Sequence, residues 1–512
     1  HSFTNPEHEQ RAAEAIRRAA PELRVSLSSE VVPEIREFER TSTALANVYV
    51  QGLVEDYLDD MRGRLEQLGF GGRLTVMLSS GGIATVETAT RFPVRMLESG
   101  PAAGALAAAA FGEAAGEPDL LSFDMGGTTA KLCAIAGGRP LVSEEFEVDR
   151  VYRLKRGSGL PLKIPVVDMI EIGVGGGSIA RVSALGTLAV GPDSAGADPG
   201  PACYGLGGTE PTVTDADLVL GYLDPGYFLG GRMPLDPEAA RAAVGSVAEP
   251  LGLSVDDAAW GIHQVVNENM ANAARVHAVE RGLDPRRLPL FAFGGAGPVH
   301  ALGVAAALGS PAVYAPPGAG VMSAAGFLTA PLAFDFVRTR RTLLDELDWA
   351  EAEALFAEME RAGEELLGLD EVTHRRIADL RYVGQGHELR VDVPPGGAAE
   401  LRAAFERRYR ELYGHEGPAV PVEALNWRVV SSGPRPELGR PVHARTDAAP
   451  LKGEREAFFP GRRRSVPVYD RYALEPGARL DGPAIVEERE STLVVPPGRA
   501  AEVTEQLAVV VR

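Results

Sequence analysis

The chain has 512 residues, a mass of 54.1 kDa and a formal net charge of −20 at pH 7. Its hydrophobic fraction of 45% and charged fraction of 24% are those of a globular protein and exclude a largely disordered chain. The acidic balance, with no basic stripe to offset it, argues against nucleic acid and against an anionic membrane as partners.

Cysteine usage and hydropathy narrow the class of protein further. The two cysteines, Cys133 and Cys203, exclude a disulfide scaffold and a cysteine-based zinc site. Together with the lack of a recognisable signal peptide, this usage predicts a cytoplasmic protein. The longest apolar run, residues 102–111, is too short to span a bilayer. At roughly 100–200 residues per domain, the length predicts about three domains.

The N-terminal part is predicted to mix helices with short strands. Apolar spacing predicts helices over residues 9–20 and 43–68. Residues 26–32 are predicted to form a strand and a turn. A short strand at residues 74–78 precedes a glycine pair, and the segment Gly100-Pro101 opens an alanine-rich helix.

The middle of the chain is predicted to be α/β. A strand at residues 120–123 runs directly into a glycine-rich turn, and residues 256–282 form a long helix. A second strand at residues 290–293 leads through another glycine-rich turn into a helix at residues 300–308.

The C-terminal part is predicted to be richer in strands. Helices are expected at residues 344–367 and 398–413, and strands at residues 376–383 and 388–393. From Leu425 onward the pattern is one of strands and turns. Few catalytic residue types cluster there, so this part is predicted to be a mainly β accessory domain.

The strongest chemical motif is Asp124-Met125-Gly126-Gly127-Thr128-Thr129, which follows a predicted strand. Two glycines let backbone N–H groups approach an anion closely, and the two hydroxyls add donors. A carboxylate at such a turn suits Mg²⁺ that bridges to phosphate oxygens. The motif lacks the Gly-Lys-Ser/Thr ending of a P-loop. A tight β-hairpin without a ligand explains the same residues equally well.

Further glycine-rich and basic segments are candidates for the same site. Gly294-Gly295-Ala296-Gly297-Pro298 joins a strand to a helix, which leaves room for a ribose or a flat ring and favours anionic groups at the helix N-terminus. Gly175-Gly176-Gly177 is predicted to be a flexible or closely approached loop, with a glycine-rich hairpin as the alternative. Residues 153–163 are either a mobile cationic loop or an ordinary solvated one.

Lysine is rare, and one lysine follows the strongest motif. Only four of the 51 basic residues are lysines: Lys131, Lys155, Lys163 and Lys452. A bias this strong favours lysine where a compact ammonium is needed, because lysine and arginine are not interchangeable. Chance is the alternative explanation.

Other reactive residue types have structural explanations. Cys203 is predicted to be a buried small residue in a rigid loop rather than a nucleophile. His300 either approaches the Gly294 turn or is a core or capping histidine. The nine histidines show no His-x-x-x-His spacing, which predicts no tight zinc site. Four polar residues share one helix that either borders a nucleotide or forms a polar interface: Asn267, Glu268, Asn272 and Arg275.

Several more short motifs follow one another along the chain. They are Asn5-Pro6-Glu7-His8-Glu9, Glu39-Arg40-Thr41-Ser42-Thr43, Leu97-Glu98-Ser99-Gly100-Pro101-Ala102-Ala103-Gly104, Ala197-Asp198-Pro199-Gly200-Pro201-Ala202-Cys203-Tyr204-Gly205, Thr212-Val213-Thr214-Asp215-Ala216 and Pro317-Gly318-Ala319-Gly320. With the motifs above, this order resembles the hydantoinase A/5-oxoprolinase family, which includes subunits of acetone and acetophenone carboxylases. The resemblance covers nearly the whole chain.

The resemblance implies an α/β fold with ribonuclease-H-like lobes of the actin, Hsp70 and sugar-kinase type, closing on Mg·ATP, plus a C-terminal α+β accessory domain rich in β. It implies a remnant of an N-terminal domain at residues 1–35, the ATP-binding catalytic domain at residues 36–335 and the accessory domain at residues 336–512. The family's first phosphate loop has no match in this chain, so the chain is expected to be shortened at its N-terminus.

The resemblance also implies the site residues. The family's second phosphate loop maps onto Asp124–Thr129, with Asp124 as catalytic residue and metal ligand. Many members carry Asp where this chain has Lys131, which puts a second acidic metal contact in doubt and predicts a catalytic contact of Lys131 with a phosphate. The expected nucleotide-binding residues are Gly126, Gly127, Thr128, Thr129, Gly175, Gly176, Gly177, Gly294, Gly295, Gly297 and Pro298.

The implied activity is ATP- and Mg²⁺-dependent hydrolysis of a cyclic amide of the hydantoin or 5-oxoproline type, by phosphorylation of the amide oxygen. The chain would be the nucleotide-binding subunit of a hetero-oligomer with a large hydantoinase B-type subunit. The alternatives are an ATP-dependent ketone carboxylase subunit and a non-catalytic scaffold subunit.

Overall fold

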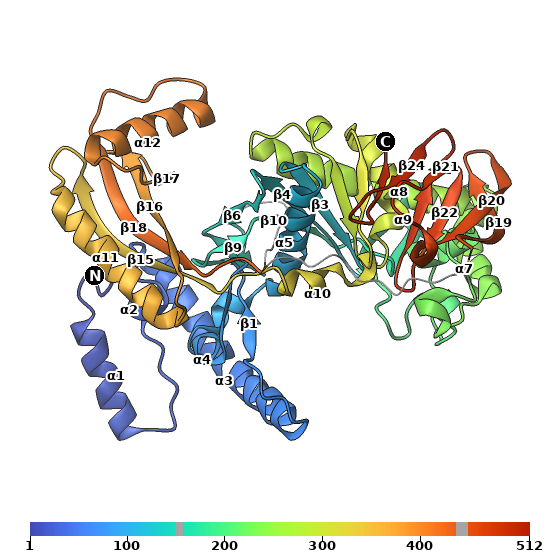
Figure 1. Cartoon of the computed structure of the whole chain (residues 1–512). Coiled ribbons are helices and arrows are strands. Elements are labelled where there is room, and N and C mark those ends of the chain that lie inside the picture. Colours follow the sequence, from blue (N-terminus) through green and yellow to red (C-terminus); the bar gives the residue numbers. More distant parts are fainter. Residues whose placement is uncertain (150, 152–156, 437–448) are drawn as a thin grey trace. The chain divides into compact units, whose positions relative to one another are not determined.

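The computed structural model describes residues 1–149, 151, 157–436 and 449–512 (Figure 1). The chain divides into two compact units that interleave along the sequence. Unit 1 comprises His1–Ala102, Val142–Val167 and Ala330–Pro436, and unit 2 comprises Ala103–Leu141, Asp168–Thr329 and Glu437–Arg512. The sequence boundaries at residues 35/36 and 335/336 express a family resemblance, and they remain predictions.

Unit 2 is built on one large mixed sheet. Its strands, in spatial order, are β10 (Met169–Ile172), β4 (Ala130–Ala136), β3 (Leu120–Met125), β13 (Leu290–Phe293), β14 (Val313–Ala315), β25 (Val509–Val511), β24 (Ala500–Val503) and β21 (Arg479–Asp481), with β5 (Arg139–Pro140) paired to β4. Strands β3, β13 and β14 are parallel, and β4 runs antiparallel between β3 and β10. This order and direction, with β4 reversed among the first five strands, are those of a ribonuclease-H-like sheet, so the predicted fold class is confirmed.

The central strands are buried, as their sequences require. Strand β13 is buried throughout, and β3 is buried except at Asp124, which is partly exposed. A continuous apolar run is typical of a strand that is covered on both faces of a parallel sheet. The helices of unit 2 are α6 (Val213–Val219), α7 (Pro237–Leu251), α8 (Val255–Glu280), α9 (Gly297–Leu308) and α10 (Met322–Phe327), while α5 (Ser99–Ala114) runs into this unit from unit 1.

The C-terminal residues belong to unit 2 and are rich in strands. Besides β21, β24 and β25, they form a four-stranded sheet in the order β19 (Leu451–Phe459), β20 (Arg462–Asp470), β22 (Ala484–Glu487) and β23 (Thr492–Val495). Strands β11 (Ser178–Val182) and β12 (Leu188–Ser194) form a separate antiparallel pair. The last strand of the chain, β25, pairs with β14, so the C-terminus completes the sheet on which β3 lies.

Unit 1 contains an antiparallel sheet covered by two helices (Figure 1). The sheet order is β15 (Ala333–Leu343), β18 (Val422–Ser432), β16 (Thr373–Tyr382) and β17 (Leu389–Asp392), and the covering helices are α11 (Trp349–Leu367) and α12 (Ala398–Tyr413). The remaining elements are α1 (Glu7–Ala19), α2 (Ser28–Val31), α3 (Glu37–Gln67), α4 (Val86–Arg91) and the strand pairs β1 (Thr75–Met77) with β2 (Ile83–Thr85), β6 (Val142–Ser143) with β9 (Val166–Val167), and β7 (Phe146–Val148) with β8 (Leu160–Leu162).

The strand predicted over residues 26–32 is wrong, because this segment contains helix α2. The reason is a contact distant in sequence. The Glu9 carboxylate accepts hydrogen bonds from the Ser28 hydroxyl at 2.6 Å and from the Ser29 N–H at 2.9 Å. It therefore satisfies an N–H donor in the first turn of α2, where no side chain of the N-cap residue does so. Burial works against the ionised carboxylate, but these hydrogen bonds hold the pKa of Glu9 at about 2.

The apolar periodicity of residues 43–68 predicts helix α3 correctly, but several of its apolar side chains lie on the exposed side of the helix. Leu45, Tyr49 and Leu53 are 61%, 87% and 76% exposed. The face that packs within unit 1 is instead largely polar and includes Thr43 and Asn47. Asn47 is fully buried because its amide donates to the Arg91 carbonyl and accepts from the Val94 N–H.

In the described part of the chain, none of the helices combines the length and the apolar character needed to cross a membrane.

Candidate functional site

Asp124 lies near the carboxyl end of β3, an inner strand of the large sheet of unit 2. The strand register places it beside Lys131 of β4 and Phe293 of β13. Its Oδ2 accepts a hydrogen bond from the Ser323 hydroxyl at 3.3 Å. Burial raises the pKa of Asp124, and the Lys131 ammonium and the Ser323 hydrogen bond offset part of this rise. A partly desolvated carboxylate is a group whose ionised form a divalent cation would stabilise.

The turn after Asp124 closes a β-hairpin with open space above its glycines. The Gly126 N–H donates to the Thr129 carbonyl at 3.1 Å, so the hairpin alternative describes the backbone correctly. A Cβ atom added to Gly126 or Gly127 would meet no atom of the described residues within 4 Å. Neither glycine is among the described residues with positive φ. Packing and backbone strain therefore do not require glycine at either position, and the space over the turn is free for a ligand.

The loop at Gly175–Gly177 packs directly on this turn. The Gly176 N–H donates to the Gly126 carbonyl at 3.0 Å, and the Gly177 N–H donates to the Gly127 carbonyl at 2.6 Å. A Cβ on Gly175 would lie 2.7 Å from backbone atoms of Gly127 and Thr128. The two main chains can approach this closely because Gly175 has no side chain. The expectation of a closely approached loop is therefore confirmed.

The Gly294 turn meets Asp124 from the neighbouring parallel strand. Gly294 has φ of 85°, and a Cβ there would lie 2.4 Å from the Met125 carbonyl oxygen and 2.5 Å from Asp124 Oδ1. The Ala296 N–H donates to the same Met125 carbonyl at 3.0 Å. The structure thus brings three sequence motifs together: the Asp124 turn, the Gly175 loop and the Gly294 turn. Gly297 and Pro298 begin helix α9, and Pro298 is buried.

Lys131 is held beside this site by two oxygen atoms. Its ammonium lies 2.9 Å from Glu171 Oε1 of β10 and donates to Thr129 Oγ1 at 3.2 Å. The side chain of Lys131 is 21% exposed. The ammonium thus lies next to the last residue of the hairpin turn, and its contact with a phosphate stays a prediction.

Replacing Lys131 with methionine is expected to raise the pKa of Asp124 further, because the variant removes the cation that opposes the effect of burial. A raised pKa keeps the carboxyl protonated to a higher pH, so metal-dependent activity should set in at a higher pH. The measurement is the pH profile of Mn²⁺- or Mg²⁺-dependent ATP turnover. Lys131→Arg keeps the charge and is the matched control. An unshifted pH profile of ATP turnover in Lys131→Met would contradict the role of Lys131 in lowering the pKa of Asp124.

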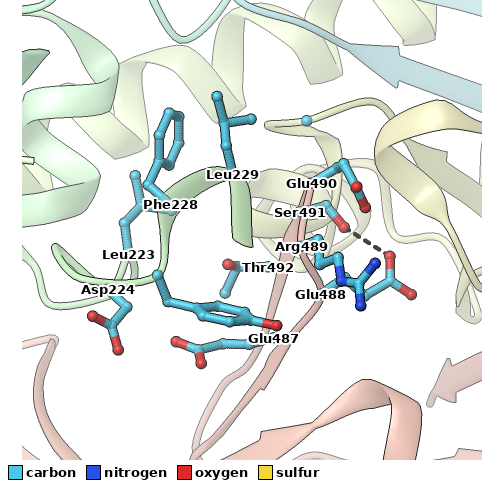
Figure 2. Close-up of a pocket in the computed structure, with 12 residues that line it drawn as sticks. Leu223, Asp224, Phe228, Leu229, Glu487, Glu488, Arg489, Glu490, Ser491 and Thr492 are labelled. Carbon is cyan, nitrogen blue, oxygen red and sulfur yellow. Dashed lines mark hydrogen bonds between the residues drawn. The ribbon is translucent and has the colours of Figure 1, made fainter. Parts of the chain in front are cut away.

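A hairpin near the C-terminus contributes residues to a pocket that Gly295 also lines. Figure 2 shows apolar side chains of the Leu223–Leu229 segment facing residues Glu487–Thr492 of the β22–β23 hairpin. The space between these residues amounts to about 340 Å³ when the adjoining open solvent is included. Residues of the C-terminal part therefore line a pocket beside the Gly294 turn, although few catalytic residue types cluster in that part of the sequence. In the sequence, this hairpin is marked by the acidic run Glu487-Glu488-Arg489-Glu490.

Glu488 attaches this hairpin to the Gly294 turn. Its carboxylate accepts hydrogen bonds from the N–H groups of Gly318 and Ala319 at 3.1 and 3.0 Å, and the Ala319 carbonyl accepts from the Gly294 N–H at 2.9 Å. The Arg471 guanidinium donates to the same carboxylate at 3.2 Å. Burial raises the pKa of Glu488, and the Arg471 charge opposes the rise. Residues close to the C-terminus therefore support a turn almost 200 positions earlier.

The remaining candidates lie away from the glycine turns. Cys203 is fully buried, and this burial with the negative charge of Asp215 raises the pKa of its thiol, so the structural interpretation is confirmed. Arg275 donates to Asn272 at 2.6 Å on the exposed side of α8. Within the segment 153–163, residues 153–156 lie outside the described residues, and Lys163 is buried against Glu34 in unit 1.

Two histidines meet a carboxylate in the core beside α9. His263 Nδ1 lies 2.9 Å from Asp217 Oδ1, and His300 Nε2 lies 3.1 Å from Asp217 Oδ2. His300 Nδ1 lies 2.8 Å from Asn267 Oδ1, so Asn267 borders this cluster and His300 is a core residue. The spacing of histidines in the sequence did not reveal the convergence, because the three residues of the donor set come from three different helices.

Comparison with known proteins gives two matches to family models. Residues 40–336 match the hydantoinase/oxoprolinase family, and residues 344–507 match the hydantoinase/oxoprolinase C-terminal domain. Together the two models span most of the chain.

Individual relatives extend this result. The chain is 35% identical to caprolactamase subunit alpha of Pseudomonas jessenii over 97% of its own length and 73% of the relative. It is 34% identical to the acetophenone carboxylase gamma subunit of Aromatoleum aromaticum over 97% of its own length and 70% of the relative. The crystal structure of the ATP-dependent caprolactamase from Pseudomonas jessenii aligns with a TM-score of 0.83 and 32% identity, covering all of this chain and 75% of that one.

Proposed function

The chain belongs to the hydantoinase/oxoprolinase family, and from this premise we propose that it is the nucleotide-binding subunit of an ATP-dependent enzyme that opens a cyclic amide. The observation that carries the proposal is the open space above Gly126 and Gly127 beside a partly desolvated Asp124. A phosphate chain with its metal ion fits both features, because the turn offers backbone donors and Asp124 offers a hard oxygen ligand.

The three glycine segments suggest how ATP lies. The phosphates lie over Gly126–Thr129, and Asp124 holds Mg²⁺ directly or through water. The Gly175 loop holds the hairpin turn in place through hydrogen bonds to the carbonyls of Gly126 and Gly127. The nucleoside lies over Gly294 and Gly295 and reaches toward the pocket bounded by Phe228 and the β22–β23 hairpin.

The chemistry follows from the stability of a cyclic amide. Transfer of the γ-phosphoryl group to the amide oxygen turns that oxygen into a good leaving group and releases ADP. Water then adds to the activated carbon, and the ring C–N bond breaks, so the nitrogen leaves as an amine and an acyl phosphate remains. A second water hydrolyses the acyl phosphate to the carboxylate and inorganic phosphate. Bound Mg²⁺ neutralises phosphate charge during the transfer. Asp124 holds the metal ion in place, and Lys131 places a second positive charge next to Thr129.

The relatives suggest a partner and a second candidate activity. Caprolactamase alpha and acetophenone carboxylase gamma are each named as subunits, so we propose a hetero-oligomer with a large hydantoinase B-type subunit. The 34% identity to the carboxylase subunit equally supports an ATP-dependent ketone carboxylase. The open turn beside Asp124 favours either enzyme over a scaffold, since a scaffold needs no space for a ligand.

Bicarbonate dependence separates the two enzymes. The chain with its partner subunit is assayed for ATP turnover with 5-oxoproline, a hydantoin or caprolactam, and separately with acetone or acetophenone. We expect ADP and the ring-opened product to form in a fixed ratio without bicarbonate. ATP turnover that requires both bicarbonate and a ketone would contradict the amidohydrolase proposal and support the carboxylase.

A further inference from the structure

Helix α6 contacts the Gly175 loop and the start of α9, which follows the Gly294 turn, through two residues of one face. Its N-terminus is fixed by a capping box, in which the Thr212 hydroxyl accepts from the Asp215 N–H and the Asp215 carboxylate accepts from the Thr212 N–H. Asp215 is fully buried and also accepts from the Cys203 N–H at 2.8 Å. The start of α6 is therefore held rigidly by polar contacts in the core.

Thr214 holds the Gly175 loop. Its backbone N–H and its hydroxyl both donate to the Gly176 carbonyl, at 2.8 and 2.9 Å. A Cβ on Gly176 would lie 2.7 Å from the Thr214 hydroxyl oxygen, so loop and helix are in direct contact. The same Gly176 bonds through its N–H to the hairpin turn after Asp124. Thr214 thus contacts the phosphate side of the site indirectly, through Gly176.

Asp217, three residues further along α6, holds the start of α9. It accepts a hydrogen bond from His300, which lies in the first turn of α9 directly after the Gly294 turn. Burial works against the ionised carboxylate, but the positive charge of His300 and the hydrogen bonds from His263 and His300 hold the pKa of Asp217 at about 2. Asp217 therefore stays ionised near neutral pH and accepts hydrogen bonds from both imidazoles.

We infer that α6 is a positioning helix that fixes the spacing between the phosphate side and the nucleoside side of the site, through Thr214 and Asp217. Residues three apart on a helix face the same way, so one rigid turn carries both contacts. Thr214 and Asp217 act through the Gly176 carbonyl and the His300 ring. The link to nucleotide rests on the proposed function, whereas the link between the two segments rests on these contacts alone.

Amide hydrogen exchange of the ligand-free protein tests the link directly. The reporters are the N–H groups of Gly176 and Gly177 for the loop and of Ala296 for the turn, since each is hydrogen-bonded across the site. Thr214→Val removes the hydroxyl donor, and Asp217→Asn removes the charge. We expect each variant to speed exchange about tenfold at all three reporters, including those it does not touch. Exchange that rises only in the segment next to each substitution would overturn the inference.

Two matched control variants keep this test interpretable. Thr214→Ser keeps the hydroxyl and should restore slow exchange at Ala296. Val219→Ala shortens a buried side chain of the same helix and should leave all three reporters slow. Thr214→Val is the milder of the two changes and decides the outcome if Asp217→Asn does not fold. Faster exchange in Val219→Ala to the same extent would show a loss of general stability and would overturn the positioning role.

A second readout concerns the nucleotide. Thr214→Val should raise the Kd for Mg·ADP about tenfold, and Thr214→Ser should bind like the unmodified protein. An unchanged Kd in Thr214→Val, with exchange altered at all three reporters, would overturn the role in nucleotide binding. Failure of the unmodified protein to bind Mg·ADP would count against the proposed function, while the exchange result would still decide the link between the segments.

Discussion

Replacing Asp124 with asparagine is expected to lower Mg²⁺-dependent ATP turnover by at least about 10³-fold. The variant keeps the shape of the side chain and an oxygen that can accept from Ser323, but it loses the charge that binds the metal ion. Phosphoryl transfer relies on metal and cationic groups to offset phosphate charge, so weaker metal binding should slow the transfer.

The same substitution should leave the melting temperature unchanged or slightly higher. Because burial raises the pKa of Asp124, the folded state binds its proton more tightly than the unfolded state does. The ionised carboxylate therefore costs stability as the pH rises through the unfolded and then the folded pKa. Asparagine carries no charge and avoids this cost. Thermal unfolding and turnover are measured on the same samples, and a large fall in melting temperature or an unchanged rate would contradict the account.

Gly175→Ala is expected to reduce nucleotide affinity at least about 100-fold and to destabilise the fold by about 1–3 kcal/mol. The added Cβ would lie 2.7 Å from backbone atoms of Gly127 and Thr128, and a main chain cannot yield as the end of a flexible side chain can. The hairpin turn would be displaced from the loop that supports it. Calorimetric titration with Mg·ADP and denaturant unfolding measure the two effects.

Gly127→Ala is the matched control for that result. Its Cβ meets no described atom within 4 Å, so stability should stay within about 0.5 kcal/mol of the unmodified protein. Affinity should still fall, because the methyl group enters the space assigned to the phosphates. Unchanged affinity in Gly127→Ala would show that this space does not hold the ligand, whatever the outcome for Gly175→Ala.

The centre of the site could be predicted from sequence because its signals are local. A buried run that ends in Asp124 and two glycines predicts a strand and a tight turn, and the structure has both. Gly294 follows a second buried run in the same way. Two parallel strands side by side then bring their carboxyl ends together, which is how residues 170 positions apart meet.

The parts that escaped prediction depend on contacts distant in sequence. Helix α2 forms where Glu9 supplies its acceptor, and the pocket next to Gly295 needs a hairpin near the C-terminus. The helical period of α3 is visible in the sequence, but the side that packs is decided by partners such as the Arg91 carbonyl. No local pattern carries this information, because each of these contacts is made by a residue outside the segment itself.

A crystal structure with Mg²⁺ and a non-hydrolysable ATP analogue tests the central claim most directly. The account predicts the metal ion next to Asp124, the phosphates over Gly126–Thr129 and the nucleoside over Gly294 and Gly295. Binding of the analogue elsewhere in unit 2, or a metal ion bound by Asp217 and the two histidines instead of Asp124, would contradict it.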